Sequence, residues 1–313
     1  HRWFLDALCA VNDGERTRLG KELNSYMSTT RQTAPPNFGV SVVAGDAWKI
    51  GQDKKLGGVA ALTYGRSYQQ RSVSFRKFNS SDRNGVKVPS AVEEGTAEEG
   101  TDNVRVGAFG NVSLELTKDH KLSLTGLQSQ SATKLDSDAQ TFKGANGSFR
   151  GIHLEYVSRS LSFGQLRGTH RFSALKDAEI DWHVDLASAS RNQPDTRDTL
   201  YKSSGLVDMP GYNWATGTNS GQHFYSDQSE FTKSGGLDYT QPIVTKPSFN
   251  TKLKVGTLLT SRSRDFSARR FIFEPSGRGL VDLAGPSSCP GDWVSSCPDK
   301  LFRQDLIGPG LLL

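Results

Sequence analysis

The chain has 313 residues, of which 35% are hydrophobic, and it carries 38 Lys and Arg against 33 Asp and Glu, a net charge of +5. This mild charge, without a basic run interleaved with aromatic residues, argues against a nucleic-acid-binding protein. No run of about 18 apolar residues occurs, which excludes a membrane-spanning helix, whereas a β-barrel stays possible because half of its strand residues are polar.

The first part of the chain, residues 1–35, is polar and irregular. It has some helical character from Asp13 to Met27, and the prolines Pro35 and Pro36 prevent a helix from continuing. We therefore expect a long loop that carries a short helix.

Alternation of apolar and polar residues predicts four strands in the first half of the chain. The first runs from Asn37 to Ile50, the second from Leu56 to Phe78, and the third from Val104 to Leu116, and the fourth starts at Leu122 and loses its pattern in the polar stretch Gln128–Asp138. Residues 79–103, between the second and third strands, are rich in glutamate, and we expect a solvated acidic loop there.

Four more strands are predicted after residue 150. The fifth, Ile152–Phe172, changes parity along its length, which indicates either a bulge or a change of environment. The sixth is the most regular, because apolar residues alternate strictly with polar ones from Ile180 to Ala187. A very long loop, Asn192–Ser229, is expected next. The seventh strand holds Leu237 and Tyr239, and the eighth runs from about Leu253 to Arg270.

The predicted connections alternate between short and long along the chain. The predicted strands, of roughly 14 to 25 residues, are longer than the usual 5 to 6 of soluble proteins and exceed the 9 to 11 that cross a bilayer. Short turns at one end and long loops at the other are typical of an antiparallel up-and-down transmembrane β-barrel, with short periplasmic turns and long extracellular loops. The alternative is a soluble sandwich, in which a second sheet would cover the apolar face.

Two cysteines, Cys289 and Cys297, lie in a stretch rich in Ser, Pro and Gly. This context favours a small disulfide loop in an oxidising compartment. Metal ligation is the alternative, but two cysteines without a nearby histidine make a poor zinc site. Cys9 is left over, and its partner stays open.

Asp181, His183 and Asp185 alternate on one face of the sixth strand, with Arg105, Glu115, His153 and Glu155 on neighbouring strands. They could form a metal or acid–base site, but the spacing is what strand alternation produces everywhere, so we favour a charged lumen wall that pairs with itself or with a plug domain. The hydrolase elbow, the phosphate loop and the dinucleotide fingerprint are all missing. We predict no catalytic residue, no metal, no cofactor and no enzymatic activity.

The candidates for ligand binding are arginines and aromatic residues near strand ends. Arg191 and Arg197 are expected where the sixth strand leaves the membrane, and Arg262, Arg264 and Arg269 at the matching end of the eighth. Arginine offers planar, bidentate donors to anionic ligands, although ion pairs at the rim or contacts with lipid phosphates would explain the same residues. Aromatic side chains in the long loop could stack on a substrate or pack against their own loop: Tyr212, Trp214, Phe224 and Tyr225.

Several stretches carry a resemblance to a known family: Ala34–Asp46, Lys55–Tyr64, Tyr156–His170, Pro194–Asp198 and Arg264–Phe271. In these, the chain resembles the barrel region of large TonB-dependent outer-membrane receptors. The motifs are structural repeats of the barrel wall, so they specify the family better than the ligand. The resemblance implies that the eight strands are a middle section of a barrel of about 22 strands.

The resemblance also implies a domain organisation. Residues 1–35 would be an extracellular loop with a short helix, residues 36–275 eight strands, and residues 276–313 an extracellular loop with the disulfide. Neither a plug domain nor a TonB box is recognised in this sequence, and we interpret the chain as part of a longer protein.

The function implied is that of a receptor and transporter in the outer membrane of a Gram-negative bacterium, which takes up a scarce solute using energy supplied through TonB. The predicted partners are TonB, reached through the missing N-terminal region, outer-membrane lipid, and a solute, peptide or protein ligand. Nucleic acid is not expected. The alternative is a barrel that serves as a cell-surface binding or anchoring protein without active transport.

Overall fold

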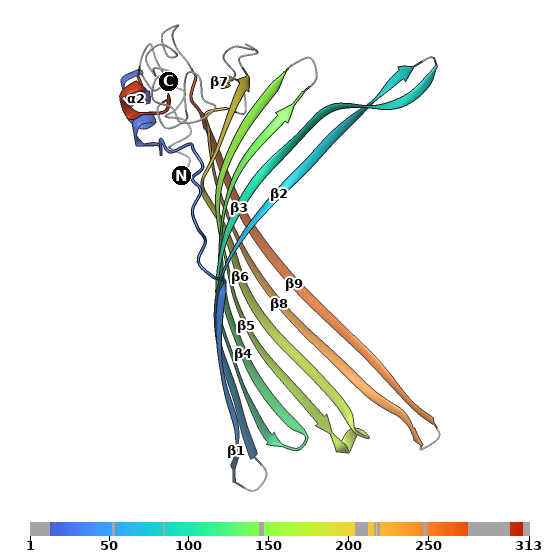
Figure 1. Cartoon of the computed structure of the whole chain (residues 1–313). Coiled ribbons are helices and arrows are strands. Elements are labelled where there is room, and N and C mark those ends of the chain that lie inside the picture. Colours follow the sequence, from blue (N-terminus) through green and yellow to red (C-terminus); the bar gives the residue numbers. More distant parts are fainter. Residues whose placement is uncertain are drawn as a thin grey trace.

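The computed structural model describes residues 13–51, 54–83, 85–143, 147–203, 212–215, 217, 220–246, 249–274 and 301–308. They form one antiparallel sheet with a small helical element beside its upper end (Figure 1). The strands lie in the sheet in chain order, and only the short β7, which pairs with β6, stands off this path. The predicted all-β, antiparallel up-and-down fold is confirmed.

The elements have the following bounds. Helix α2 spans Asp13–Glu22, and the strands are β1 (Phe38–Ile50), β2 (Lys54–Arg83), β3 (Val86–Thr117), β4 (His120–Phe142), β5 (Ser148–Phe172), β6 (Ala178–Ser203), β7 (Tyr212–Trp214), β8 (Gln222–Lys246) and β9 (Phe249–Ile272). Short 3₁₀ turns occur at Ser173–Leu175 and Gln304–Leu306. Helix α2 ends at Glu22, five residues before Met27, where the helical character predicted from the sequence ends.

None of the helices in the described ranges is long and apolar enough to cross a membrane.

The acidic stretch before Val104 is not a loop, so the prediction for residues 79–103 is wrong. β2 and β3 continue as a hairpin up to the pair Arg83 and Val86. The glutamates of β3 face basic residues of β2 across the strands, with Arg71–Glu99 at 2.5 Å and Lys77–Glu93 at 2.8 Å. These cross-strand charge pairs offset the low strand propensity of the sequence.

Two further predictions of irregular chain are wrong. β4 continues through the polar stretch Gln128–Asp138 to Phe142, and the expected loop Asn192–Ser229 contains the end of β6 and the start of β8. Both faces of these upper strand segments carry polar residues, so the alternation of apolar and polar residues that predicts a strand is missing there.

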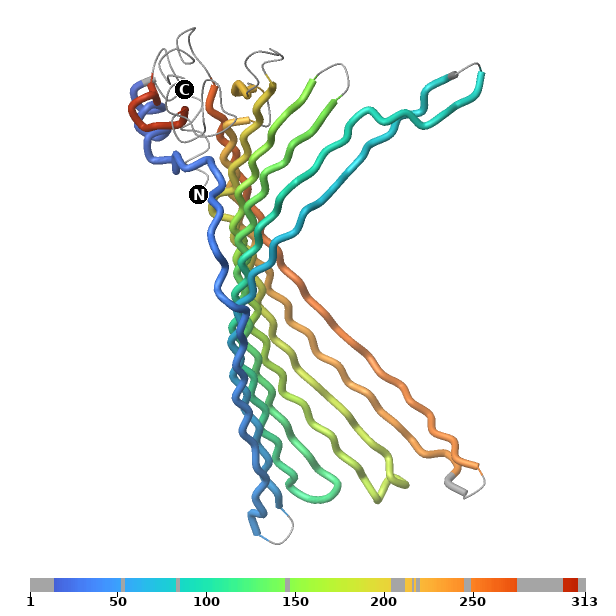
Figure 2. Tube along the Cα trace, in the orientation of Figure 1, coloured from blue at the N-terminus to red at the C-terminus, as the bar shows by residue number. Residues whose placement is uncertain are grey.

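The long loops expected at the upper end are therefore partly replaced by strand. The β2–β3 connection is a tight turn and residues 143–147 connect β4 to β5, while residues 204–221, which include β7, separate β6 from β8. The sheet is strongly twisted, and the β2–β3 hairpin projects away from the other strands at the top of Figure 2. A large twist is the normal consequence of long strands in one sheet.

The change of parity in β5 falls where the pairing of β5 with β6 is irregular. The register between β4 and β5 is unbroken from His120 and His170 to Phe142 and Ser148, so β5 itself contains no bulge against β4. The irregularity lies in the pairing of β5 with β6, between Leu154 and Ser158.

The two faces of the sheet differ in chemistry over its lower half. On one side, here called the apolar face, Val112, Leu124, Leu166 and Val184 form a single row across β3, β4, β5 and β6. The opposite side, here called the polar face, carries residues such as Asp181 and His183. The alternation predicted for the sixth strand is confirmed.

Over the lower half of the sheet, the apolar face has no second layer over it. Val112 and Val184 are each 51% exposed, Leu186 is 50% exposed and Val255 is 60% exposed, so described residues do not bury them. The accessible surface of the chain is 20630 Å², against about 13,000 Å² for a compact globular protein of this size. A soluble sandwich, which requires a covered apolar face, is therefore not what this sheet forms by itself.

The sheet does not close on itself within the described residues, and β1 and β9 are its edges. Cys9, Cys289 and Cys297 lie outside the described residues, so the disulfide stays a prediction.

Aromatic side chains mark the lower end of the apolar face. The Trp182 indole N–H donates to His170 Nε2 at 3.1 Å, and His170 in turn lies beside His120, with 3.1 Å between their Nδ1 atoms. Trp182 can lie across β5 because residue 168, opposite it, is a glycine, and a Cβ on Gly168 would be 2.4 Å from the indole nitrogen.

We predict that Gly168→Val displaces the Trp182 ring and lowers the free energy of unfolding by about 1–3 kcal/mol, the usual cost of overpacking. The matched control is Gly164→Val, on the same strand and face, where a Cβ meets nothing within 4 Å. Denaturant unfolding of both variants measures the difference. Equal stability of the two variants would contradict the close packing of Trp182.

Candidate functional site

The seven residues predicted to contact ligand fall into three places. Arg197 and Arg269 lie in a polar cluster at the upper end of β6, β8 and β9; Arg191, Arg262 and Arg264 lie on the polar face; Tyr212 and Trp214 lie in β7. The structure therefore brings some of these residues together and separates the arginines from the aromatic residues.

The upper polar cluster is built around Asp195. The pairing of β6 with β8 is irregular between Gln193 and Thr196, where Pro194 lacks the N–H that a regular ladder needs. One oxygen of Asp195 lies 2.7 Å from His223 Nδ1, and the other lies 3.4 Å from Arg197 Nε. The irregular pairing thus places one carboxylate between two basic groups of the adjacent chain segments.

His223 is fully buried in this cluster. Its ring stacks on Tyr225 at 6.5 Å between centroids and meets the edge of Phe273 at 5.6 Å. Burial, and then the negative charge of Asp195, raise the pKa of Tyr225 to about 12, while Arg197 and Arg269 oppose that shift. Sequence reasoning did not single out His223, because no motif connects it to Asp195, 28 residues earlier.

Arg197 also holds the N-terminal segment against the sheet. Its guanidinium donates to the backbone carbonyl of Tyr26 and lies 5.9 Å from the centre of the Tyr26 ring. This arginine is therefore committed to contacts inside the chain, with Tyr26 and with Asp195.

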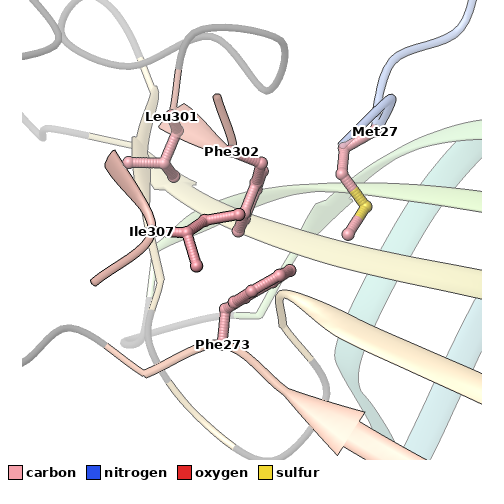
Figure 3. Close-up of a cluster of buried hydrophobic side chains, with 5 residues drawn as sticks. All are labelled: Met27, Phe273, Leu301, Phe302 and Ile307. Atoms are coloured by element: carbon pink, nitrogen blue, oxygen red, sulfur yellow. The ribbon is translucent and has the colours of Figure 1, made fainter. Parts of the chain in front are cut away.

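A hydrophobic cluster lies beside the polar one. Met27, Phe273, Leu301, Phe302 and Ile307 bury one another, which joins the N-terminal segment, the end of β9 and residues 301–308 (Figure 3). This terminal cluster is the largest buried apolar group that the described residues form at the upper end.

The two aromatic residues of β7 have different surroundings. Trp214 packs edge-on against Phe302 at 5.4 Å and donates its indole N–H to Ser220 Oγ at 2.7 Å, so it stabilises its own segment. Tyr212 lines a shallow depression together with Phe75, Glu94 and other residues of β2 to β5.

A second titratable group lies on β5 and β6. His153 Nδ1 lies 2.6 Å from Asp198, and its Nε2 lies 3.4 Å from Glu155. Glu155 also accepts a hydrogen bond from Gln193 at 3.3 Å and lies 3.8 Å from Arg191. The hydrogen bond with Asp198, together with the charge of both carboxylates, raises the pKa of His153 despite its partial burial.

Arg262 and Arg264 lie within β9, ten and eight residues before its end at Ile272. They lie on the polar face and both contact Glu230 of β8, at 3.2 Å and 2.5 Å. Arg191 is followed by twelve more residues of β6, and its expected position where this strand leaves the membrane stays a prediction.

The polar residues of the lower sixth strand pair with their neighbours. Thr169 donates to Asp181 at 2.7 Å, and Gln165 and Ser234 both donate to Asp185 at 2.8 Å. Among the residues that the structure describes, no group of three or more His, Cys, Asp or Glu side chains could hold a metal ion. The hydrogen bonds of Asp181 and Asp185 are those of a wall that pairs with itself.

With this geometry established, comparisons add no relative. No protein-family model matches the chain, and neither the curated proteins nor the solved structures contain a significant match. The resemblance to TonB-dependent receptors thus stays a hypothesis that rests on the sequence stretches quoted for it.

We predict a pH-dependent contribution of His153 to stability. Because the pKa of His153 is raised on folding, its stabilising contribution is full below about pH 6.5, the pKa in the unfolded chain, and decreases as the pH rises through the folded value. Unfolding of the protein and of His153→Gln at pH 5.5 and 8 measures it. The difference between them should be larger at pH 5.5, and an equal or reversed difference would contradict the pairing with Asp198.

Proposed function

We propose that the protein is an outer-membrane β-barrel receptor of the TonB-dependent type, which takes up a scarce solute, and that this chain forms part of the barrel wall and its extracellular end. The observation that carries the proposal is the uncovered apolar face of a single-layer sheet, backed by a polar face. Lipid outside and water inside is the arrangement in which both faces meet a suitable solvent.

Energetics support hydrocarbon as the cover of the apolar face. Moving one large apolar side chain out of water contributes about 1.5–3 kcal/mol, and exposed apolar residues of this face recur on β1 to β6, β8 and β9. A protein surface of this extent would be an aggregation hazard in water. The aromatic residues Trp48, Trp182 and Tyr239 near its lower end fit the interface with lipid headgroups.

Strand length supports the same orientation. About 9 to 11 residues cross a bilayer, while β2 to β6, β8 and β9 have 23 to 32, so these strands would project well beyond the membrane at their upper ends. In this arrangement residues such as Phe163–Phe172 of β5 span the bilayer, and the clusters around Asp195 and His153 lie outside it.

Closure of the barrel supports a larger assembly. The edge strands β1 and β9 expose unpaired backbone groups, which hydrocarbon does not tolerate. A closed wall therefore needs additional strands, and the barrel of about 22 strands implied by the family resemblance would supply them.

We predict that Leu124→Arg on the apolar face makes folding into lipid vesicles less favourable by about 2–4 kcal/mol, the cost of arginine near the bilayer midplane. The adjacent Thr125→Arg, on the polar face, should cost only about 1 kcal/mol through loss of its hydrogen bond with Asn111. Leu124 is 59% exposed, so if water covered this face its replacement would be neutral, and that result would contradict the membrane assignment.

Transport is tested in the bacterium itself. A strain without the gene and a strain without TonB are grown with one nutrient limiting at a time, drawn from iron complexes, cobalamin, glycans and peptides. The proposal expects both strains to share a growth defect on one nutrient. Outer-membrane localisation with no shared defect on any of them would instead favour the cell-surface anchor.

A further inference from the structure

The polar face carries a row of arginines above the proposed membrane level. Arg105 of β3, Arg159 of β5 and Arg191 of β6 occupy one row of the register, with Ser131 of β4 between the first two. We call these three residues the arginine row. Adjacent strands are about 4.8 Å apart, so Arg159 and Arg191 are direct neighbours and Arg105 lies about 10 Å away.

Two of the three arginines lack any partner within the described part of the chain. Arg105 and Arg159 are exposed and form neither a hydrogen bond nor an ion pair with a described residue. Arg191 contacts Glu155, but that carboxylate is shared with His153 and Gln193. Like charges directly opposite each other destabilise a sheet, so the Arg159–Arg191 pair costs stability unless an anion lies between them.

The surrounding polar face does not neutralise the row. Arg262 and Arg264 flank it on β9 and share Glu230, which gives five arginines and two glutamates, a local net charge of +3 from 5 − 2. Guanidinium groups bind carboxylate and phosphate groups through paired hydrogen bonds.

An apolar surface lies directly below the row on the same face. Phe109, Leu127 and Phe163 occupy one register row across β3, β4 and β5, and Leu161 lies between them and Arg159. Phe109 and Leu161 are exposed, at 38% and 39%. The aromatic row is four residues below the arginines along each strand, which corresponds to about 13 Å.

From this juxtaposition we propose that the polar face binds a small anionic ligand, with a carboxylate or phosphate group on Arg105, Arg159 and Arg191 and an apolar body on Phe109, Leu127 and Phe163. This inference rests on the proposed function in one respect: it assumes that the polar face lines a water-filled passage. Charge complementarity selects an anion, and the adjacent rings select one that carries an apolar group.

The test is titration calorimetry of the full-length protein in nonionic detergent and phosphate-free buffer. The probe is 1-naphthyl phosphate, compared with 1-naphthol, which lacks the charge, and inorganic phosphate, which lacks the ring. We expect 1-naphthyl phosphate to bind at least tenfold more tightly than either, and the double variant Arg105→Gln/Arg159→Gln to weaken its binding about tenfold or more.

The matched control is Arg171→Gln, an exposed arginine on the same strand and face, twelve residues from Arg159 towards the lower end. Its affinity should stay within twofold of the unmodified protein. Failure to bind 1-naphthyl phosphate, equal binding of 1-naphthol, or equal affinity in the double variant and the unmodified protein would each overturn the proposal. A protein that binds the probe but folds without detergent would contradict the membrane function and leave this site standing.

Discussion

One constraint underlies the structure: over the lower half of a sheet one layer thick, the apolar face is covered by no other described residue. Backbone hydrogen bonds between neighbouring strands hold the sheet together, and they are the same whether water or another medium covers its faces. The side chains decide that question. Val112, Val184 and Val255 leave apolar side chains exposed, whereas Asp181 and Asp185, on the opposite face, form hydrogen bonds with their neighbours.

The same sheet changes character towards its upper end. The alternation of apolar and polar residues fades there, and ion pairs such as Arg71–Glu99 and the clusters around Asp195 and Glu155 take over. At the end of β9 the terminal cluster of Met27, Phe273 and their neighbours joins distant parts of the chain. A sheet that is apolar outside at one end and charged at the other matches a wall that crosses a bilayer and continues beyond it.

Sequence patterns predicted the lower half of the sheet well, because strict alternation such as Ile180–Ala187 has a single structural interpretation. They failed for residues 79–103, where the strand depends on charge pairing between Glu93 and Lys77 that only the register discloses. For the candidate site, the sequence pointed to arginines as ligand-binding residues. It could not show that Arg197 contacts Tyr26 or that Arg264 contacts Glu230, because each pair lies far apart in the sequence. The alignment of Arg105, Arg159 and Arg191 likewise needs the register of four strands.

The most direct measurement is the solvent contact of each face in lipid vesicles, by electron paramagnetic resonance of single nitroxide labels in a background with its three cysteines replaced. Labels at Val112, Val184 and Val255 report on one face, and labels at Thr125, Asp185 and Gly256 on the other. The account predicts that the first three collide mainly with oxygen, which concentrates in hydrocarbon, and the other three with a water-soluble nickel complex. Equal contact with the nickel complex on both faces, or labels at Val112 and Val184 immobilised beneath a further layer of protein, would contradict it.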